Sequence, residues 1–297
     1  MPWFYPIYLD GKEVNPKRDV PINTCLFATL YQEMEGGIVI IKKLIFSGLI
    51  LAFTFITSAQ VFAVDEKDLE KQADLIAKLL VSCRVIIAQN QDLINDPDKG
   101  DKGFTGDIYI NKVKEHFKNA TDLEVSENDV FSSDPVKSSL GTLLCSAKEV
   151  INESQKIINM KGKGFKKIIP AVVGRRTSFK YNKAMGAGYY LKQTSIRYRN
   201  LANHPDDLET RYLNKFEEPG YPKDKGKGEV IANSDGSKVY RYMLPVYIKP
   251  ACLKCHGGSK GEKDIAGGTK EGYKEGEVRG AISVMTPYLS TNLVQIK

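Results

Sequence analysis

The chain has 297 residues, of which 42% are hydrophobic and 27% are charged. That apolar fraction excludes a disordered or fibrous protein and suffices for one medium-sized domain with a buried core. The 43 basic and 36 acidic residues give a net charge of +7. Because the lysines are spread through glycine-rich loops instead of forming one stripe, we expect no nucleic-acid partner.

The region before residue 64 has the pattern of an export signal. Lys42 and Lys43 precede an apolar run at 44–56, and residues 61–63 (Val-Phe-Ala) place small side chains where a signal peptidase reads them. The competing hypothesis is an uncleaved membrane anchor, which the shortness of the apolar run disfavours. The sequence therefore predicts an exported, periplasmic protein that contacts the membrane only if this segment is retained.

These features divide the chain into three parts. Residues 1–37 are expected to be an untranslated or non-native extension, 38–63 a signal peptide, and 64–297 a single mature domain. Cys25 lies in the extension and is given no chemical role.

Helices are predicted in the first half of the mature domain and strands in the second. Apolar residues recur at three- and four-residue steps, which is typical of amphipathic helices. The helices are expected at 66–95, 108–117 and 135–159, with 165–181 either helical or extended. Strands are expected at 189–199, 229–232, 239–248 and 278–286, with a hairpin turn at 233–236 (Asn-Ser-Asp-Gly). Helices followed by antiparallel strands predict an α+β fold.

The motif that carries chemistry is Cys-Leu-Lys-Cys-His at 252–256. This is the C-x-x-C-H pattern of c-type haem attachment. Two cysteines three residues apart in a tight turn can form thioethers with both vinyl groups of one haem. The next residue, His256, then lies under the iron as its axial ligand. The sequence therefore predicts one covalent haem c, held by Cys252, Cys255 and His256.

Three other hypotheses account for the motif less well. A zinc site needs further ligands, and Cys83 and Cys145 lie on separate predicted helices far upstream. A thioredoxin-like redox pair needs a strand-to-helix setting that this antiparallel region lacks. A plain disulfide between Cys252 and Cys255 leaves His256 without a role.

The residues leave the second axial position of the iron open. Its candidates are Cys145, Cys83, Met243, His116 and His204, and a vacant position is also allowed. Each of these side chains has an ordinary alternative as a core or loop residue.

Several motifs together resemble a known family. They are residues 192–209 (KQTSIRYRNLANHPDDLE), 240–245 (YRYMLP), CLKCHGG from Cys252 onward, and 272–284 (GYKEGEVRGAISV). They look like a family of unknown function with a PAS-like fold and a c-type haem. That family occurs as periplasmic haem sensor domains and as stand-alone bacterial and cyanobacterial monohaem proteins. The resemblance covers roughly 65–290.

The resemblance implies a PAS-like antiparallel sheet with N-terminal helices, and attachment at Cys252 and Cys255 with His256 as ligand. Some members use a cysteine as second ligand, from a helix shortly before the TS-x-x-x-RN strand. The corresponding region near 172–174 has no cysteine here, so Cys145 on the preceding helix is the alternative. Arg197 and Arg199 become candidates for haem-side or propionate-binding groups.

The motif allows three classes of function. The first is a monohaem cytochrome that exchanges electrons with a redox partner protein. The second is a haem-based redox or gas sensor working with a separate signalling partner. Catalysis comes last because no paired acid and base accompanies the motif, and we expect no enzyme activity.

Overall fold

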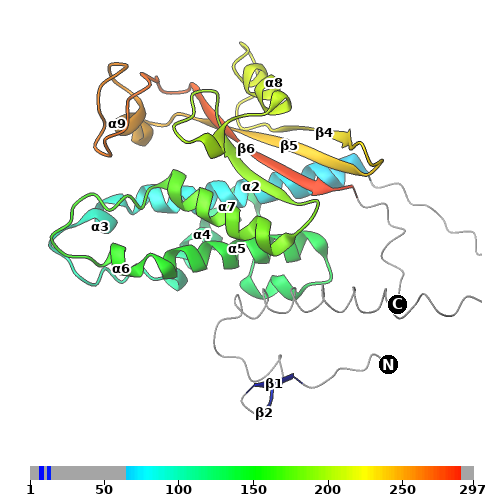
Figure 1. Cartoon of the computed structure of the whole chain (residues 1–297), viewed down its shortest axis with the longest axis horizontal. Helices are drawn as coiled ribbons and strands as arrows, with labels where there is room; N and C mark the ends of the chain where they lie inside the picture. Colours follow the sequence, from blue (N-terminus) through cyan, green and yellow to red (C-terminus); the bar gives the residue numbers. More distant parts are fainter. Residues whose placement is uncertain (1–6, 10–11, 15–64, 289–297) are drawn as a thin grey trace, which may run out of the picture.

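The computed structural model describes residues 7–9, 12–14 and 65–288 (Figure 1). The predicted signal peptide at 38–63 and most of the predicted extension at 1–37 lie outside the described residues. Two short antiparallel strands, β1 (Ile7–Leu9) and β2 (Lys12–Val14), are described in the extension. None of the helices in the described ranges is long and apolar enough to cross a membrane.

Helices fill the first half of the domain, as predicted. They are α2 (Glu66–Gln89), α3 (Gln91–Asn95), α4 (Gly106–Thr121), the 3-10 helix η2 (Glu127–Phe131), α5 (Pro135–Glu153), α6 (Gln155–Ile158) and α7 (Pro170–Met185). Side chains of the residue just before a helix can cap its first turn, as at the start of α5. Asp134 accepts hydrogen bonds from two backbone N–H groups of the first turn of α5, and Pro135 occupies its first position.

The predicted helices at 66–95 and 135–159 each turn out to be two. The first is interrupted at Asn90, whose side-chain amide donates to the carbonyl oxygen of Ile86 at 2.7 Å. The second is interrupted at Ser154, whose hydroxyl donates to the carbonyl of Val150 at 2.6 Å. Side chains that bond to the preceding turn compete with the helical ladder and can bend a helix, and both breaks carry such a bond.

The second half forms one four-stranded antiparallel sheet. Its strands are β3 (Tyr190–Thr194), β4 (Lys227–Ala232), β5 (Lys238–Tyr247) and β6 (Val278–Pro287), in the order β3-β6-β5-β4. β4 and β5 form the predicted hairpin. In its turn the N–H of Asn233 donates to the carbonyl of Ser237, and Gly236 adopts the positive φ of 82° that the turn requires. The predicted α+β fold is confirmed.

The two faces of the sheet bury different sets of side chains because successive residues of a strand point to opposite sides. Tyr240, Tyr242 and Leu244 of β5 pack in the large core shared with α2. Tyr242 also donates from its hydroxyl to Asp74 of α2 at 2.7 Å. Met243, on the other face, is fully buried against α8 (Asp207–Phe216). Figure 1 shows the sheet between the helical layer and α8.

Two predictions about this half were wrong. The strand predicted at 189–199 ends at Thr194, because Ser195 leaves the sheet and donates its N–H to the carbonyl of Asn203 at 3.1 Å. The helix α8 was not predicted. Its signals are in the sequence: Asp206 and Glu209 form a capping box, and apolar side chains follow at helical spacing.

Candidate functional site

The C-x-x-C-H motif lies at the end of the sheet, between β5 and β6 (Figure 1). The 3-10 turn η4 (Pro250–Cys252) begins with a proline and continues into the single helical turn α9 (Leu253–His256). Cys252 and Cys255 are half-buried, and neither is in a disulfide. Because residues three apart in a helical turn lie on one side of it, both thiols are presented together. No disulfide joins Cys252 to Cys255 in this structure.

His256 is oriented by a carboxylate from the loop that follows it. Its Nδ1 lies 2.9 Å from Oε2 of Glu271. Burial by itself would raise the pKa of Glu271, but hydrogen bonds from Arg199 and His256 outweigh it and lower the pKa to about 2. An ionised carboxylate can only accept, so the proton of the imidazole is on Nδ1. The Nε2 atom, which has no hydrogen-bond partner among the described residues, then carries the free lone pair.

The environment of His256 also favours the neutral ring. Burial lowers its pKa, and the positive charge of Arg279 lowers it further, against the opposing effect of Glu271. A neutral imidazole with a free nitrogen is the form that binds a metal.

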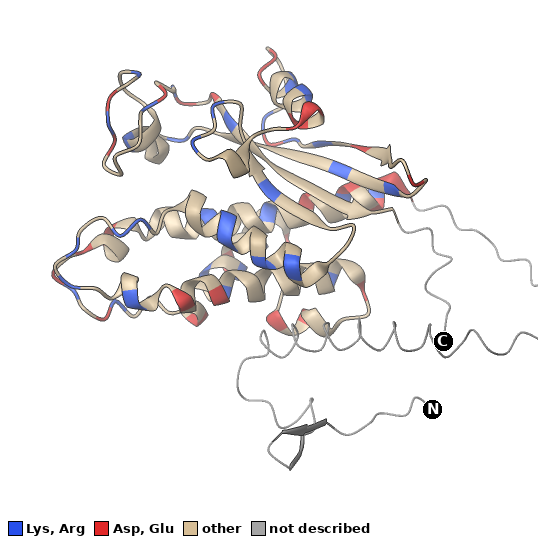
Figure 2. Ribbon diagram, in the orientation of Figure 1, with Lys and Arg blue, Asp and Glu red and all other residues tan. Residues whose placement is uncertain are grey.

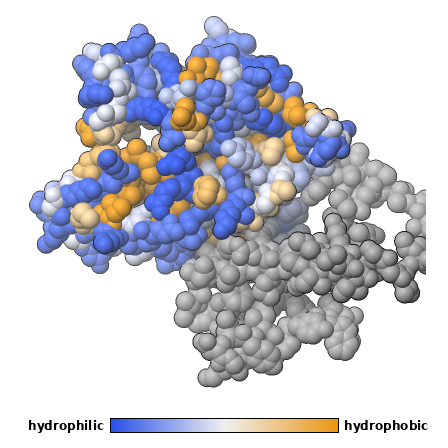
Figure 3. Space-filling view, viewed as in Figure 1, coloured by the Kyte–Doolittle hydropathy of each residue, from blue (hydrophilic) through white to orange (hydrophobic). Residues whose placement is uncertain are grey.

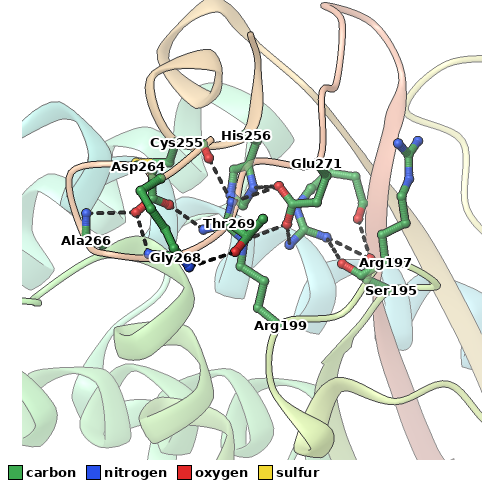
Figure 4. Close-up of polar contacts among 12 residues, drawn as sticks. Ser195, Arg197, Arg199, Cys255, His256, Asp264, Ala266, Gly268, Thr269 and Glu271 are labelled. Atoms are coloured by element: carbon green, nitrogen blue, oxygen red, sulfur yellow. Dashed lines mark hydrogen bonds and ion pairs between the residues drawn. The ribbon is translucent and has the colours of Figure 1, made fainter. Parts of the chain in front are cut away.

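Arg199 holds Glu271 and the motif together (Figure 4). It donates through Nε to Glu271 at 2.5 Å and through one terminal nitrogen to Asp264 at 2.5 Å. The other terminal nitrogen donates to the carbonyl of Cys255 at 2.7 Å and to Glu271 at 2.8 Å. One guanidinium therefore fixes the helical turn α9, the loop carboxylates and their relative positions.

The segment between α9 and β6 is an ordered loop despite its many glycines and lysines. The N–H of Tyr273 donates to the carbonyl of His256 at 2.9 Å, and Gly258 turns the chain with a positive φ of 78°. Asp264 is inside this loop and accepts from the backbone N–H groups of Ala266 and Gly268, both at 2.8 Å (Figure 4). The loop therefore has its own hydrogen-bond framework.

Arg197 and Arg199 have different surroundings. Arg199 contacts the motif directly, as described above. The guanidinium of Arg197 lies over the ring of Tyr273, 3.7 Å from its centroid, and 4.0 Å from Glu277. The prediction of a role for these arginines beside the haem stays a prediction for both, and only Arg199 touches the attachment turn.

A recess separates the loop that carries the motif from the helical layer. Figure 3 shows this hollow, bordered on the helical side by hydrophobic residues. Arg84 of α2 has its Nε buried without a hydrogen-bond partner among the described residues. Burial lowers the pKa of Arg84 to about 10, with a further contribution from Arg279. A recess bordered by hydrophobic residues suits a planar, largely apolar group.

Basic side chains elsewhere are dispersed. Figure 2 shows lysines and arginines distributed over helices, strands and loops and interspersed with acidic residues. In that view the basic side chains do not gather into one stripe.

The five candidates for a second axial ligand lie in different places. Cys83 and Met243 are fully buried in the two hydrophobic clusters, and Cys145 is buried on α5. His116 on α4 is partly exposed, and its Nδ1 lies 2.9 Å from the hydroxyl of Ser82. Burial lowers the pKa of His116, and so does the charge of Lys249 just before η4.

His204, the fifth candidate, follows the short turn η3 (Leu201–Asn203). Its ring packs edge-on against Tyr198, with centroids 5.0 Å apart. These positions do not select one of the five residues as the second axial ligand.

The sequence reasoning missed Glu271, Asp264 and Arg279. These residues lie in or directly after a loop rich in glycine and lysine, where carboxylates and basic side chains have no periodic pattern. The close spacing of the C-x-x-C-H motif made it visible in the sequence. In contrast, Glu271 lies 15 residues from His256 and 72 residues from Arg199.

Comparisons with known proteins place the chain in a family without supplying a characterised relative. No curated protein and no solved structure matches it. A family model described as Tll0287-like matches residues 64–287, which is the whole described domain from α2 to β6. The chain therefore belongs to the Tll0287-like family.

Proposed function

We propose that this protein is an exported monohaem c-type cytochrome that transfers electrons in the periplasm. In this proposal the thiols of Cys252 and Cys255 are joined to the haem as thioethers, and Nε2 of His256 ligates the iron. The haem supplies a one-electron couple.

The proposal rests on the free thiols and the oriented imidazole of the C-x-x-C-H turn. Both thiols are unpaired on one helical turn, and the adjacent imidazole has its Nδ1 engaged and its Nε2 free. A zinc site would need more donors, and no group of three or more metal-binding side chains occurs among the described residues. The donor set fits a cofactor that brings most of its own ligands.

The surroundings of the turn support haem over a small redox pair. The recess beside it is lined partly by hydrophobic residues (Figure 3), which would exclude water from a bound haem. Arg84 of α2 offers a buried guanidinium nitrogen without a partner among the described residues. The carboxylates of a haem are suitable partners for such a group.

The test is haem attachment in the mature protein, co-expressed with haem-maturation machinery. We expect a pyridine haemochrome of the c type, and haem that stays with the protein through acid–acetone extraction. Replacing Cys252 and Cys255 together by serine should abolish both. Cys83→Ser is the matched control, because it removes a buried thiol from α2 and leaves the turn intact. Covalent haem in the double variant would overturn the proposal.

The electron-transfer part is tested on the reduced protein. We expect a low-spin spectrum that carbon monoxide does not change, since an electron carrier keeps two strong ligands. Prompt binding of carbon monoxide would overturn electron transfer and favour the sensor hypothesis, while leaving covalent attachment intact.

A further inference from the structure

The contact between His256 and Glu271 is built from separate parts of the chain. His256 ends the helical turn α9, and Glu271 lies fifteen residues later, on the far side of the loop. The side chain of Glu271 is 12% exposed. A largely buried carboxylate requires compensating charges, and its partners show what holds it in place.

Three cationic or polar groups converge on Glu271. Arg199 binds both of its oxygens, at 2.5 and 2.8 Å, and Arg279 lies 3.6 Å from one of them. The Nδ1–H of His256 supplies the remaining bond at 2.9 Å. Figure 4 shows the contacts of Glu271 with His256 and Arg199. The carboxylate can therefore neither rotate away from the imidazole nor exchange its bond for one to water without breaking the pairing with Arg199.

The alternative is that Glu271 only ties the loop to the protein. The loop is already fastened by other contacts: Asp264 binds Arg199, and Tyr273 donates its N–H to the carbonyl of His256. A residue needed only as a tether would have no reason to direct one oxygen at the imidazole nitrogen. The geometry thus points to an effect on His256 itself.

We propose that Glu271 is a positioning residue that fixes His256 as the Nδ1–H tautomer, with its ring held in one orientation, and that increases electron donation from Nε2 to a bound iron. Arg199 is the residue that fixes Glu271. This inference rests on the proposed function, because it concerns the ligand of the proposed haem.

The physical consequence is a bias between the two oxidation states of the iron. A carboxylate that accepts a hydrogen bond from Nδ1–H makes the imidazole a stronger electron donor to the iron. This stabilises the more highly charged ferric state. Arg199 and Arg279 offset part of the negative charge of Glu271, so the bias is moderated.

The first experiment measures the reduction potential of the haem-loaded protein. Glu271→Gln keeps the shape of the side chain and removes its charge. We expect the oxidation equilibrium to shift about tenfold towards the ferrous form, which is about 59 mV for a one-electron couple. Glu262→Gln is the matched control, because it removes a carboxylate of the same loop that pairs with Lys270 and does not contact His256. It should leave the potential unchanged.

The second experiment needs no haem. Nitrogen-15 NMR of labelled histidine is recorded on the full chain carrying Cys252→Ser and Cys255→Ser. The chain has three histidines, so His116→Gln and His204→Gln variants assign the spectrum. We expect a protonated Nδ1 and an unprotonated Nε2 for His256, and loss of this preference when Glu271→Ala is added.

The outcomes separate this inference from the proposed function. Absence of covalent haem would sink the proposed function, whereas the tautomer can still be read in the haem-free chain. Covalent haem with an unchanged potential in Glu271→Gln would overturn the inference alone. A tautomer that ignores Glu271→Ala would overturn it as well, whatever the haem content.

Discussion

Replacing Glu209 should lower the free energy of unfolding and test how α8 is attached to the sheet. It is the third residue of α8, and its side chain is 1% exposed. One oxygen lies 2.9 Å from Nζ of Lys192 and accepts from the hydroxyl of Thr194 at 3.1 Å. The other lies 3.3 Å from Arg241 of β5. This buried carboxylate therefore joins α8 to β3 and β5 from one point.

The expected magnitude follows from what Glu209→Ala leaves behind. Breaking one side of a buried ion pair costs about 3–5 kcal/mol, because the remaining charge is buried without compensation. Here each cation keeps one acceptor: Lys192 donates to the carbonyl of His204 at 2.8 Å, and Arg241 to Asp206 at 2.7 Å. The lower end of the range therefore applies, so we expect the free energy of unfolding to fall by about 3 kcal/mol.

The assay is urea unfolding followed by far-UV circular dichroism, with both proteins in the same haem-loading state. The matched control is Glu149→Ala, which removes a 42% exposed partner of Lys180 at 3.1 Å. Lys180 keeps Glu153, and an exposed pair of this kind contributes about 0–1 kcal/mol. If Glu209→Ala cost no more than Glu149→Ala, the assignment of Glu209 as the buried link between α8 and the sheet would be wrong.

Two further predictions concern packing and pH. A Cβ at Gly141 of α5 would lie 2.3 Å from a backbone nitrogen of η2, so Gly141→Ala should cost about 1–3 kcal/mol by thermal or urea unfolding. Gly164→Ala should be close to neutral because nothing lies within 4 Å of the added carbon. Burial alone would raise the pKa of Asp206, but the N–H of Glu209 and the guanidinium of Arg241 outweigh it and lower the pKa. A carboxyl with a lowered pKa stabilises the fold above its ordinary pKa of 3.8, and this stabilisation is lost as the pH falls further. The destabilisation by Asp206→Asn should thus be full at neutral pH and shrink below about pH 4; a loss independent of pH would contradict this reasoning.

The resembling stretch 192–209 acquires a physical explanation from the structure. Lys192, Thr194 and Glu209 meet Arg241 in the buried cluster that attaches α8 to the sheet. These residues were singled out as family motifs, and their contacts show that they hold the fold together. Arg199, from the same stretch, instead contacts the C-x-x-C-H turn.

Local patterns were sufficient to predict most helices and strands and the C-x-x-C-H turn. The helices follow from apolar residues repeating at three- and four-residue steps, and the β4–β5 hairpin from Asn-Ser-Asp-Gly at 233–236. The sequence also establishes Cys252, Cys255 and His256 as one unit, since a single helical turn brings them together regardless of the rest of the fold. Such features depend on neighbours in the chain, and for that reason they can be read from it.

Tertiary structure decided what surrounds that unit. The strand predicted to extend to residue 199 ends at Thr194, because the N–H of Ser195 donates to the carbonyl of Asn203. Beyond this bend, Arg199 contacts the C-x-x-C-H turn at the carbonyl of Cys255. Glu271 meets His256 only because the loop folds back, and Arg199 reaches it across 72 residues of sequence. No periodicity encodes such contacts, since they arise from how separate elements pack. The sequence by itself thus determined which residues form the C-x-x-C-H unit proposed to hold a haem, and the fold decided which carboxylate and which arginine contact it.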